Sequence, residues 1–128
     1  MNVILSIKPI FINEIVAGRK TFEFRKKSFK KQVRKVYIYA SSPICRIVGE
    51  FIIGKVLEDT PNKIWSRTCN QAGITKEYFD EYYKNRITAC ALEIKCFRLY
   101  DVQINPYNVL DGFTPPQSFC YVNSDLLP

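Results

Sequence analysis

Histidine is absent from the 128-residue sequence, and its absence excludes several kinds of site. Without an imidazole there is no Ser-His-Asp or Cys-His catalytic pair and no histidine metal ligand. A structural zinc site would need cysteines at paired short spacings. The cysteines here are widely spaced and form no Cys-x-x-Cys: Cys45, Cys69, Cys90, Cys96 and Cys120. We therefore predict no metal and no cofactor, and we expect reduced, mostly buried thiols.

Long apolar runs are missing as well. No run approaches the roughly 20 residues that cross a bilayer. The apolar residues 3–7, which Pro9 follows, are too few for the core of a signal peptide. Because 47% of the residues are hydrophobic, the chain can bury a core of its own. We expect one domain over residues 1–128, in a soluble cytoplasmic protein that does not contact membranes. The sequence leaves the oligomeric state open.

Acidic residues are in the minority, 12 against 19 basic ones, which gives a formal net charge of +7. Such an excess attracts polyanions, of which nucleic acid is the commonest. Seven basic residues fall in one stretch without an acid: Arg25, Lys26, Lys27, Lys30, Lys31, Arg34 and Lys35. The stretch is either a loop kept soluble by its charge or a rim that contacts phosphates. Its position directly after the mixed-charge residues 18–25 favours the rim.

The pattern of apolar residues and breakers predicts a mixed α+β chain. Alternation predicts strands near residues 2–8, 20–25, 36–40, 46–58, 86–102 and 120–122. Helices are expected from Pro9 to Gly18, from Thr60 to near Gly73 and after Thr75. Two glycines inside the long strand, Gly49 and Gly54, predict bends or bulges that let a sheet curl. This order fits a small mixed β-barrel with helices inserted between strands.

Two helices carry apolar clusters that we interpret as core. In the first helix the stripe is Phe11, Ile12, Ile15 and Val16, at helical spacing. In the third it is Tyr78, Phe79, Tyr82 and Tyr83, an arrangement found more often in cores than in ligand platforms.

Residues 18–25 form a strip of mixed charge, Gly-Arg-Lys-Thr-Phe-Glu-Phe-Arg. Side chains in a strand alternate between two faces, so Phe22 and Phe24 face one side. Thr21, Glu23 and Arg25 face the other side, with Lys20 at the strand entrance. One interpretation is a binding site; the other is that Glu23 and Arg25 pair with each other and stabilise a barrel rim. Exposed ion pairs contribute only about 0 to 1 kcal/mol, so stability alone explains the cluster poorly.

The spacing Gly-x-Lys-x-x-Glu-x-Arg resembles the signature of ASCH domains, a branch of the PUA-like β-barrels. Residues 5–9, 36–43 and 48–51 look like the strands around that motif, and residues 115–119 resemble a closing segment of one subgroup. The resemblance implies a PUA-like barrel with a cleft beside the motif strand, where RNA or a nucleotide-like ligand binds.

On this resemblance Lys20, Glu23 and Arg25 line the cleft, next to the first strand. A carboxylate can accept hydrogen bonds from a base or a ribose, and arginine can contact phosphate or stack on a base. The predicted nucleic-acid-binding residues are Ser6, Lys8, Lys20, Thr21, Glu23, Arg25, Lys26, Lys27, Lys30, Lys31, Ser41 and Ser42.

Whether the chain catalyses a reaction is open at this point. One branch of ASCH proteins hydrolyses acetylcytidine with a lysine, a threonine and a glutamate. Lys20 matches that lysine, but Glu23 stands where the threonine belongs, and the glutamate position falls close to Ala72. That activity is therefore not transferred.

Three hypotheses follow. The first is an RNA-binding module with a role in regulating transcription or translation, although sequence alone does not separate RNA from DNA. The second is a hydrolase that acts on a modified nucleoside amide or an RNA phosphodiester, with Lys20 and Glu23 as catalytic candidates. The third is a regulator that contacts proteins through Trp65 and the tyrosine-rich helix.

Overall fold

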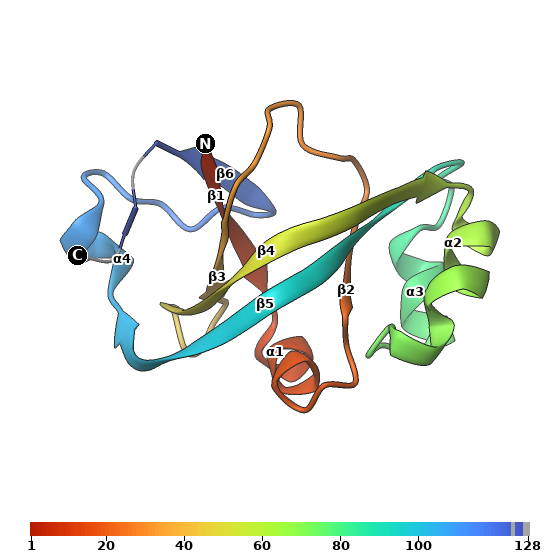
Figure 1. The fold of residues 1–128 in the computed structure, drawn as a ribbon, viewed down its shortest axis with the longest axis horizontal. Coiled ribbons are helices and arrows are strands. Elements are labelled where there is room, and N and C mark those ends of the chain that lie inside the picture. The colour runs from red at the N-terminus through yellow and green to blue at the C-terminus, as the bar shows by residue number, and fades with distance from the viewer. Residues whose placement is uncertain (124, 127–128) are drawn as a thin grey trace.

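A curled sheet of six strands forms the centre of the molecule (Figure 1). The computed structural model describes residues 1–123 and 125–126. Its strands are β1 (Asn2–Ile7), β2 (Phe22–Arg25), β3 (Val36–Ala40), β4 (Arg46–Asp59), β5 (Ala89–Ile104) and β6 (Phe119–Val122). They lie in the order β2-β5-β4-β3-β1-β6. The pair β1 and β3 is parallel, and the other neighbours are antiparallel. The predicted α+β, barrel-like class is confirmed.

The helices lie between the strands, as expected. They are α1 (Pro9–Val16), α2 (Pro61–Thr68), the short 3-10 helix η1 (Cys69–Gln71), α3 (Lys76–Tyr82) and α4 (Pro106–Val109). The predicted caps are present: the side chains of Thr60 and Thr75 accept hydrogen bonds from backbone N–H groups of the first turns of α2 and α3. Helix α4 was missed, because its four residues are too few for a helical period to be read. No helix in residues 1–123 and 125–126 is long and apolar enough to cross a membrane.

The two long strands β4 and β5 run across the whole molecule and give the sheet its curl (Figure 1). Their pairing shifts register beside Gly49 and again across Gly54, so the predicted irregularities are confirmed. At Gly49 a Cβ atom would lie 2.6 Å from the carbonyl oxygen of Arg98. The close approach of the two backbones therefore requires glycine at this bend.

Helix α1 covers one end of the core and α2 and α3 cover the other. Ile12 and Ile15 pack with apolar residues of β1 and β3, whereas Ile64 and Phe79 pack with β2. The prediction for Val16 was wrong: it is 50% exposed, because it lies on the far face of a helix that ends there. The expectation of mostly buried thiols was also wrong: Cys90 is buried, Cys45 and Cys120 are partly buried, and Cys69 and Cys96 are exposed.

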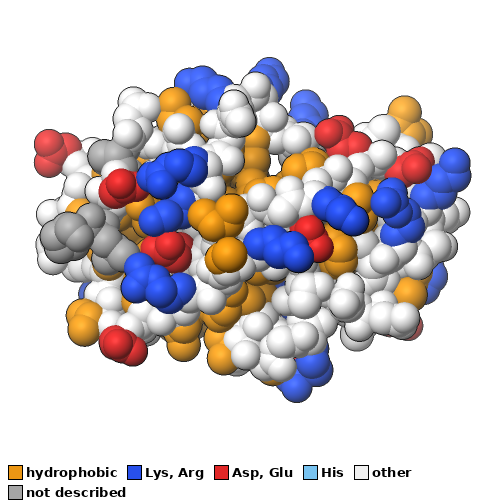
Figure 2. All heavy atoms as spheres, viewed as in Figure 1, with side chains coloured by type: hydrophobic (Ala, Val, Ile, Leu, Met, Phe, Trp, Pro, Cys, Tyr) orange, Lys and Arg blue, Asp and Glu red, His pale blue; other side chains and the backbone are white. Residues whose placement is uncertain are grey.

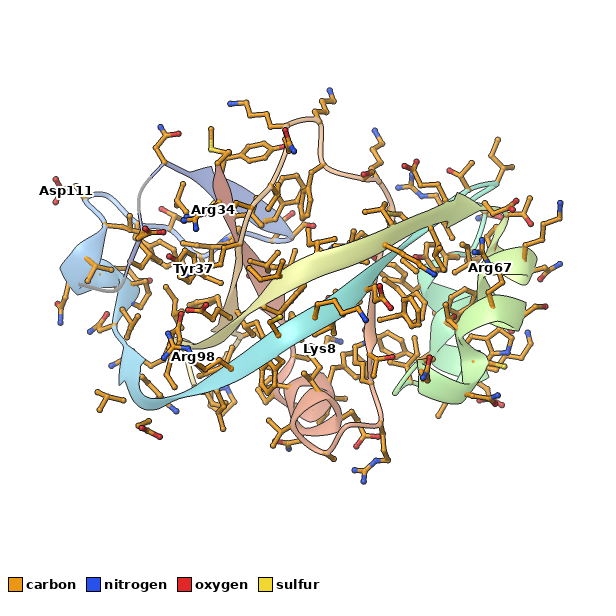
Figure 3. All side chains as sticks on the ribbon, viewed as in Figure 1. Lys8, Arg34, Tyr37, Arg67, Arg98 and Asp111 are labelled. Carbon is orange, nitrogen blue, oxygen red and sulfur yellow. The ribbon has the colours of Figure 1, made fainter. Side chains whose placement is uncertain are left out.

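A buried polar cluster fixes the end of the sheet that is distant from α2. The carboxylate of Glu50, only 8% exposed, accepts hydrogen bonds from Tyr100 (2.8 Å) and Arg98 (3.1 Å) and lies 3.2 Å from the ammonium of Lys35. Burial raises the pKa of Glu50, but these hydrogen bonds outweigh it and keep the pKa below its usual value. Arg98 lies near Tyr37 at this end, whereas Arg67 lies on α2 at the other (Figure 3).

Candidate functional site

A cleft of about 750 Å³ opens between α3, the end of β1, the strand β2 and the segment before β6. Six cations and one carboxylate are among the described residues that line it: Lys8, Lys20, Arg25, Lys26, Lys27, Arg86 and Glu23. Elsewhere, on the face drawn in Figure 2, Lys and Arg side chains are spread along the molecule with acids between them. The cleft is therefore more strongly cationic than a mixed surface and attracts anions.

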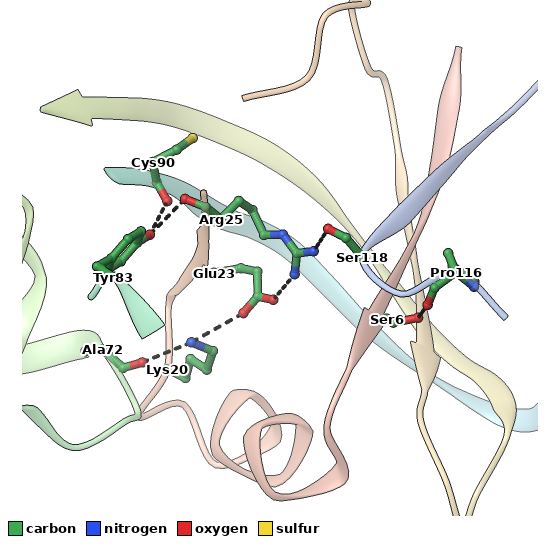
Figure 4. A network of polar contacts seen from close by, with 9 residues as sticks. All are labelled: Ser6, Lys20, Glu23, Arg25, Ala72, Tyr83, Cys90, Pro116 and Ser118. Carbon is green, nitrogen blue, oxygen red and sulfur yellow. Dashed lines mark hydrogen bonds and ion pairs between the residues drawn. The ribbon is translucent and has the colours of Figure 1, made fainter. Parts of the chain in front are cut away.

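The floor of the cleft is a buried ion cluster (Figure 4). The ammonium of Lys20 lies 3.4 Å from Oε1 of Glu23, and the guanidinium of Arg25 donates to Oε2 at 3.2 Å. Their side chains are 1%, 9% and 10% exposed for Lys20, Glu23 and Arg25. Both carboxylate oxygens are thus engaged, and the cluster keeps one uncompensated positive charge in a region that water hardly reaches.

Lys20 is held by local backbone as well as by charge. Its Nζ donates to the carbonyl oxygen of Ala72 at 3.1 Å and lies 4.8 Å from the ring centroid of Phe24. The turn that brings Ala72 there has Gly73 at φ +65°, and a Cβ at Gly73 would lie 2.3 Å from Cβ of Lys20. Only glycine therefore permits this approach. Ala72 does lie beside Lys20, but it supplies a carbonyl rather than a carboxylate.

Burial determines the direction in which the pKa of Lys20 is shifted. Desolvation lowers the pKa of the ammonium, Glu23 raises it and Arg25 lowers it again, and the net effect is a pKa below the usual value. The carboxylate of Glu23 opposes the loss of the proton but does not outweigh burial.

Arg25 links the two edges of the sheet. Its guanidinium donates to Oγ of Ser118, which precedes β6, while its backbone belongs to β2 at the other edge (Figure 4). Just after β2, the ring of Phe29 packs edge-on against Phe119 at 4.7 Å between centroids. The hydroxyl of Tyr121 accepts from the backbone N–H of Lys30 at 3.0 Å. The basic stretch is therefore anchored to β6.

The predicted site residues fall into two groups. Nine line the cleft: Ser6, Lys8, Lys20, Glu23, Arg25, Lys26, Lys27, Ser41 and Ser42. Three are not among its lining residues: Thr21, Lys30 and Lys31. The backbone of Thr21 pairs with Gln71 and Ile94, and Lys31 lies over the ring of Tyr121 at 4.9 Å. Of the basic stretch, only Arg25, Lys26 and Lys27 line the cleft. Arg34 and Lys35 form ion pairs with Asp125 and Glu50.

Several lining residues were not singled out as site residues from sequence. Helix α3 contributes Tyr78 and Tyr82, which we had assigned to the core with Phe79 and Tyr83. Tyr39 is 2% exposed, and burial together with the neighbouring Cys45 thiol raises its pKa to about 12. The helical register could have separated Tyr78 and Tyr82 from Phe79 and Tyr83, since only one face of a surface helix packs inward.

Comparison with known proteins agrees with this architecture. Among curated proteins, an ASCH domain-containing ribonuclease of Zymomonas mobilis is 28% identical over 95% of this chain and 84% of its own length. The large ribosomal subunit protein uL22 of Ureaplasma parvum is 30% identical over 80% of this chain, which spans only 33% of that relative. Among solved structures, ASCH from Zymomonas mobilis has a TM-score of 0.88 at 23% identity, covering 98% of this chain and 90% of that one.

The curled sheet with helices inserted between its strands has the fold of the solved ASCH structure. Residues 5–98 match the ASCH domain, and the chain belongs to the ASCH domain family. The resemblance seen in the strip at residues 18–25 is thereby confirmed.

Proposed function

We propose that the cleft binds RNA, with its basic rim along the phosphate backbone. The observation that carries the proposal is the set of six cations around a single carboxylate in one concave site. A curated relative over nearly the whole chain is called a ribonuclease, which supports RNA over other polyanions. A role in regulating transcription or translation stays a prediction.

The buried ion cluster at the floor of the cleft supports recognition of a particular chemical group of the ligand, beyond general electrostatic attraction. Lys20 has three N–H donors, and Glu23 and Ala72 account for two of them. Arg25 has five donors, two of which reach Glu23 and Ser118. The remaining donors of Arg25, whose side chain is 10% exposed, offer hydrogen bonds to phosphate or base oxygens, whereas the buried Lys20 holds Glu23 in place. Because the cluster is already ordered by its internal pairs, a ligand meets a preorganised surface.

The test is RNA binding by fluorescence anisotropy at several salt concentrations. The double substitution Lys26→Glu with Lys27→Glu is expected to weaken binding of single-stranded RNA by more than tenfold at low salt. It should also reduce the slope of log K against log salt by about 1.4, or 0.7 per lost phosphate contact. The matched control is Lys63→Glu with Arg67→Glu on α2. Both of these residues line a separate shallow depression. If both double substitutions weaken RNA binding equally, RNA does not bind in the cleft and the proposal is wrong.

RNA cleavage is the second candidate, and the lowered pKa of Lys20 is the observation that favours it. A lysine that loses its proton more readily can take the proton of a 2′-hydroxyl, whose oxygen attacks phosphorus and displaces the 5′-oxygen of the next nucleotide to leave a 2′,3′-cyclic phosphate. Water protonates the leaving oxygen, and Arg25 can stabilise the charge on the phosphoryl oxygens. Labelled RNA incubated with Lys20→Arg provides the test, since arginine keeps the charge but does not act as a base. Cleavage by the wild-type protein that disappears in Lys20→Arg, while RNA binding persists, supports a catalytic Lys20. Equal cleavage by both proteins, purified in parallel, excludes that role.

A further inference from the structure

Helix α3 divides its aromatic residues between the core and the cleft. Phe79 and Tyr83 are 1% and 3% exposed and belong to the apolar core. Tyr78 and Tyr82, one residue earlier in each case, are only partly buried and line the cleft, and Tyr82 also packs against the core. Residues four apart lie one above the other on a helix, so the two rings form a single row along the cleft wall.

Each of these two rings has the ammonium of a lysine over one face. Nζ of Lys8 lies 5.3 Å from the ring centroid of Tyr78, and Nζ of Lys26 lies 5.0 Å from that of Tyr82. Both lysines are exposed and line the same cleft, although one follows β1 and the other follows β2. The rings of Phe11 and Tyr78 pack in a T-shaped arrangement with their centroids 4.9 Å apart, which fixes the orientation of the Tyr78 ring.

The geometry points to a stacking subsite for unpaired bases, formed by Tyr78 and Tyr82, in which the exposed side chains of Lys8 and Lys26 move from the ring faces to the flanking phosphates. This inference rests on the proposed RNA function and adds the class of RNA, a short single-stranded segment. An aromatic row with cations beside it is the arrangement that binds single strands, because every base has a face to stack and every linkage carries a charge. A cleft of about 750 Å³ suits a ligand of one or two nucleotides.

A duplex does not fit this arrangement. Its bases are already stacked on each other, and an A-form helix presents mainly ribose hydroxyls and phosphates to a protein. A purely structural role for the rings would leave no preference for bases over the bare backbone.

The experiment compares a single-stranded RNA with an abasic oligomer of equal length and charge, both titrated into the full chain by anisotropy. We expect the RNA to bind at least about tenfold more tightly than the abasic oligomer, from the stacking of one base. The variant Tyr78→Leu with Tyr82→Leu should lose this preference and keep its affinity for the abasic oligomer. Tyr78→Phe with Tyr82→Phe should retain the preference, and Tyr107→Leu on the exposed helix α4 serves as the matched control.

A measurement on the unaltered protein covers the case in which the leucine variant does not fold. A single strand containing 2-aminopurine should lose fluorescence on binding, because stacking on an aromatic ring quenches it. If the RNA and the abasic oligomer bind equally, if a duplex of the same sequence binds as tightly, or if 2-aminopurine stays bright, the stacking subsite is wrong while the proposed RNA function stands. If no RNA binds, the proposed function itself is wrong.

Discussion

Replacing Glu23 by glutamine removes the one negative charge from the buried floor of the cleft and leaves its shape nearly unchanged. Lys20 and Arg25 would then face a neutral amide in a region where their side chains are 1% and 10% exposed. The substitution therefore tests whether the cluster is a true buried ion network.

Two estimates of the cost agree. At 3.4 Å and an effective dielectric constant of 20, the Lys20–Glu23 attraction amounts to about 5 kcal/mol. Lys20 can limit the loss by releasing its proton, which at pH 7 also costs about 5 kcal/mol from an ordinary pKa near 10.4. Removing one partner of a buried pair destabilises other proteins by about 3–5 kcal/mol. We predict a loss of about 3–5 kcal/mol in the free energy of unfolding.

Urea unfolding measures this loss, with an unchanged m-value as the check that the transition is still two-state. The double variant Lys20→Met with Glu23→Gln is the matched control, since it removes the isolated ammonium too and should recover more than half of the loss. A loss below about 1 kcal/mol for Glu23→Gln would refute the reasoning, because it would show that water screens the cluster.

The same cluster predicts how stability depends on pH. The pKa of Lys20 is lower in the folded chain than in the unfolded one, so the unfolded chain binds the proton more tightly. The free energy of unfolding attributable to Lys20 therefore rises with pH between the lowered pKa and about 10.4. Measured against Lys20→Met, the wild-type protein should gain relative stability as pH increases through the alkaline range. A difference that is constant with pH contradicts the burial of the ammonium.

Three smaller changes test other parts of the structure. Gly73→Ala should cost about 1–3 kcal/mol in urea unfolding, because it combines φ +65° with a Cβ contact of 2.3 Å to Lys20. Tyr83→Phe, which removes a hydroxyl lying 2.8 and 3.2 Å from carbonyl oxygens of β2 and β5, should cost about 1–2 kcal/mol and leave RNA affinity unchanged. Phe29→Leu should lose about 0.5–1.5 kcal/mol of ring contact with Phe119 and make the basic stretch more sensitive to limited proteolysis; an unchanged cleavage rate would contradict the anchoring.

Local signals account for most of what could be predicted of the fold. Alternation located the strands, and Pro9, Thr60 and Thr75 marked where helices begin, since period and capping act over a few residues. Helix α4 was too short to give a period. The exposure of Val16 depends on which neighbours cover α1, and that is decided by tertiary packing.

The candidate site was only partly predictable for a related reason. The motif at residues 18–25 identified its charged residues as site candidates, but the residues that they contact lie far along the chain. Ser118 is 93 residues from Arg25, and Ala72 is 52 residues from Lys20. Such contacts leave no local period in the sequence. The helical register separates Tyr78 and Tyr82 from Phe79 and Tyr83, but tertiary packing decides which of the two pairs faces the core.

A structure of the protein bound to a short single-stranded RNA tests the central claim most directly. The account predicts a phosphate backbone along Lys26 and Lys27 and a nucleotide over the remaining donors of Arg25. RNA bound to another face, with the cleft empty, would contradict it.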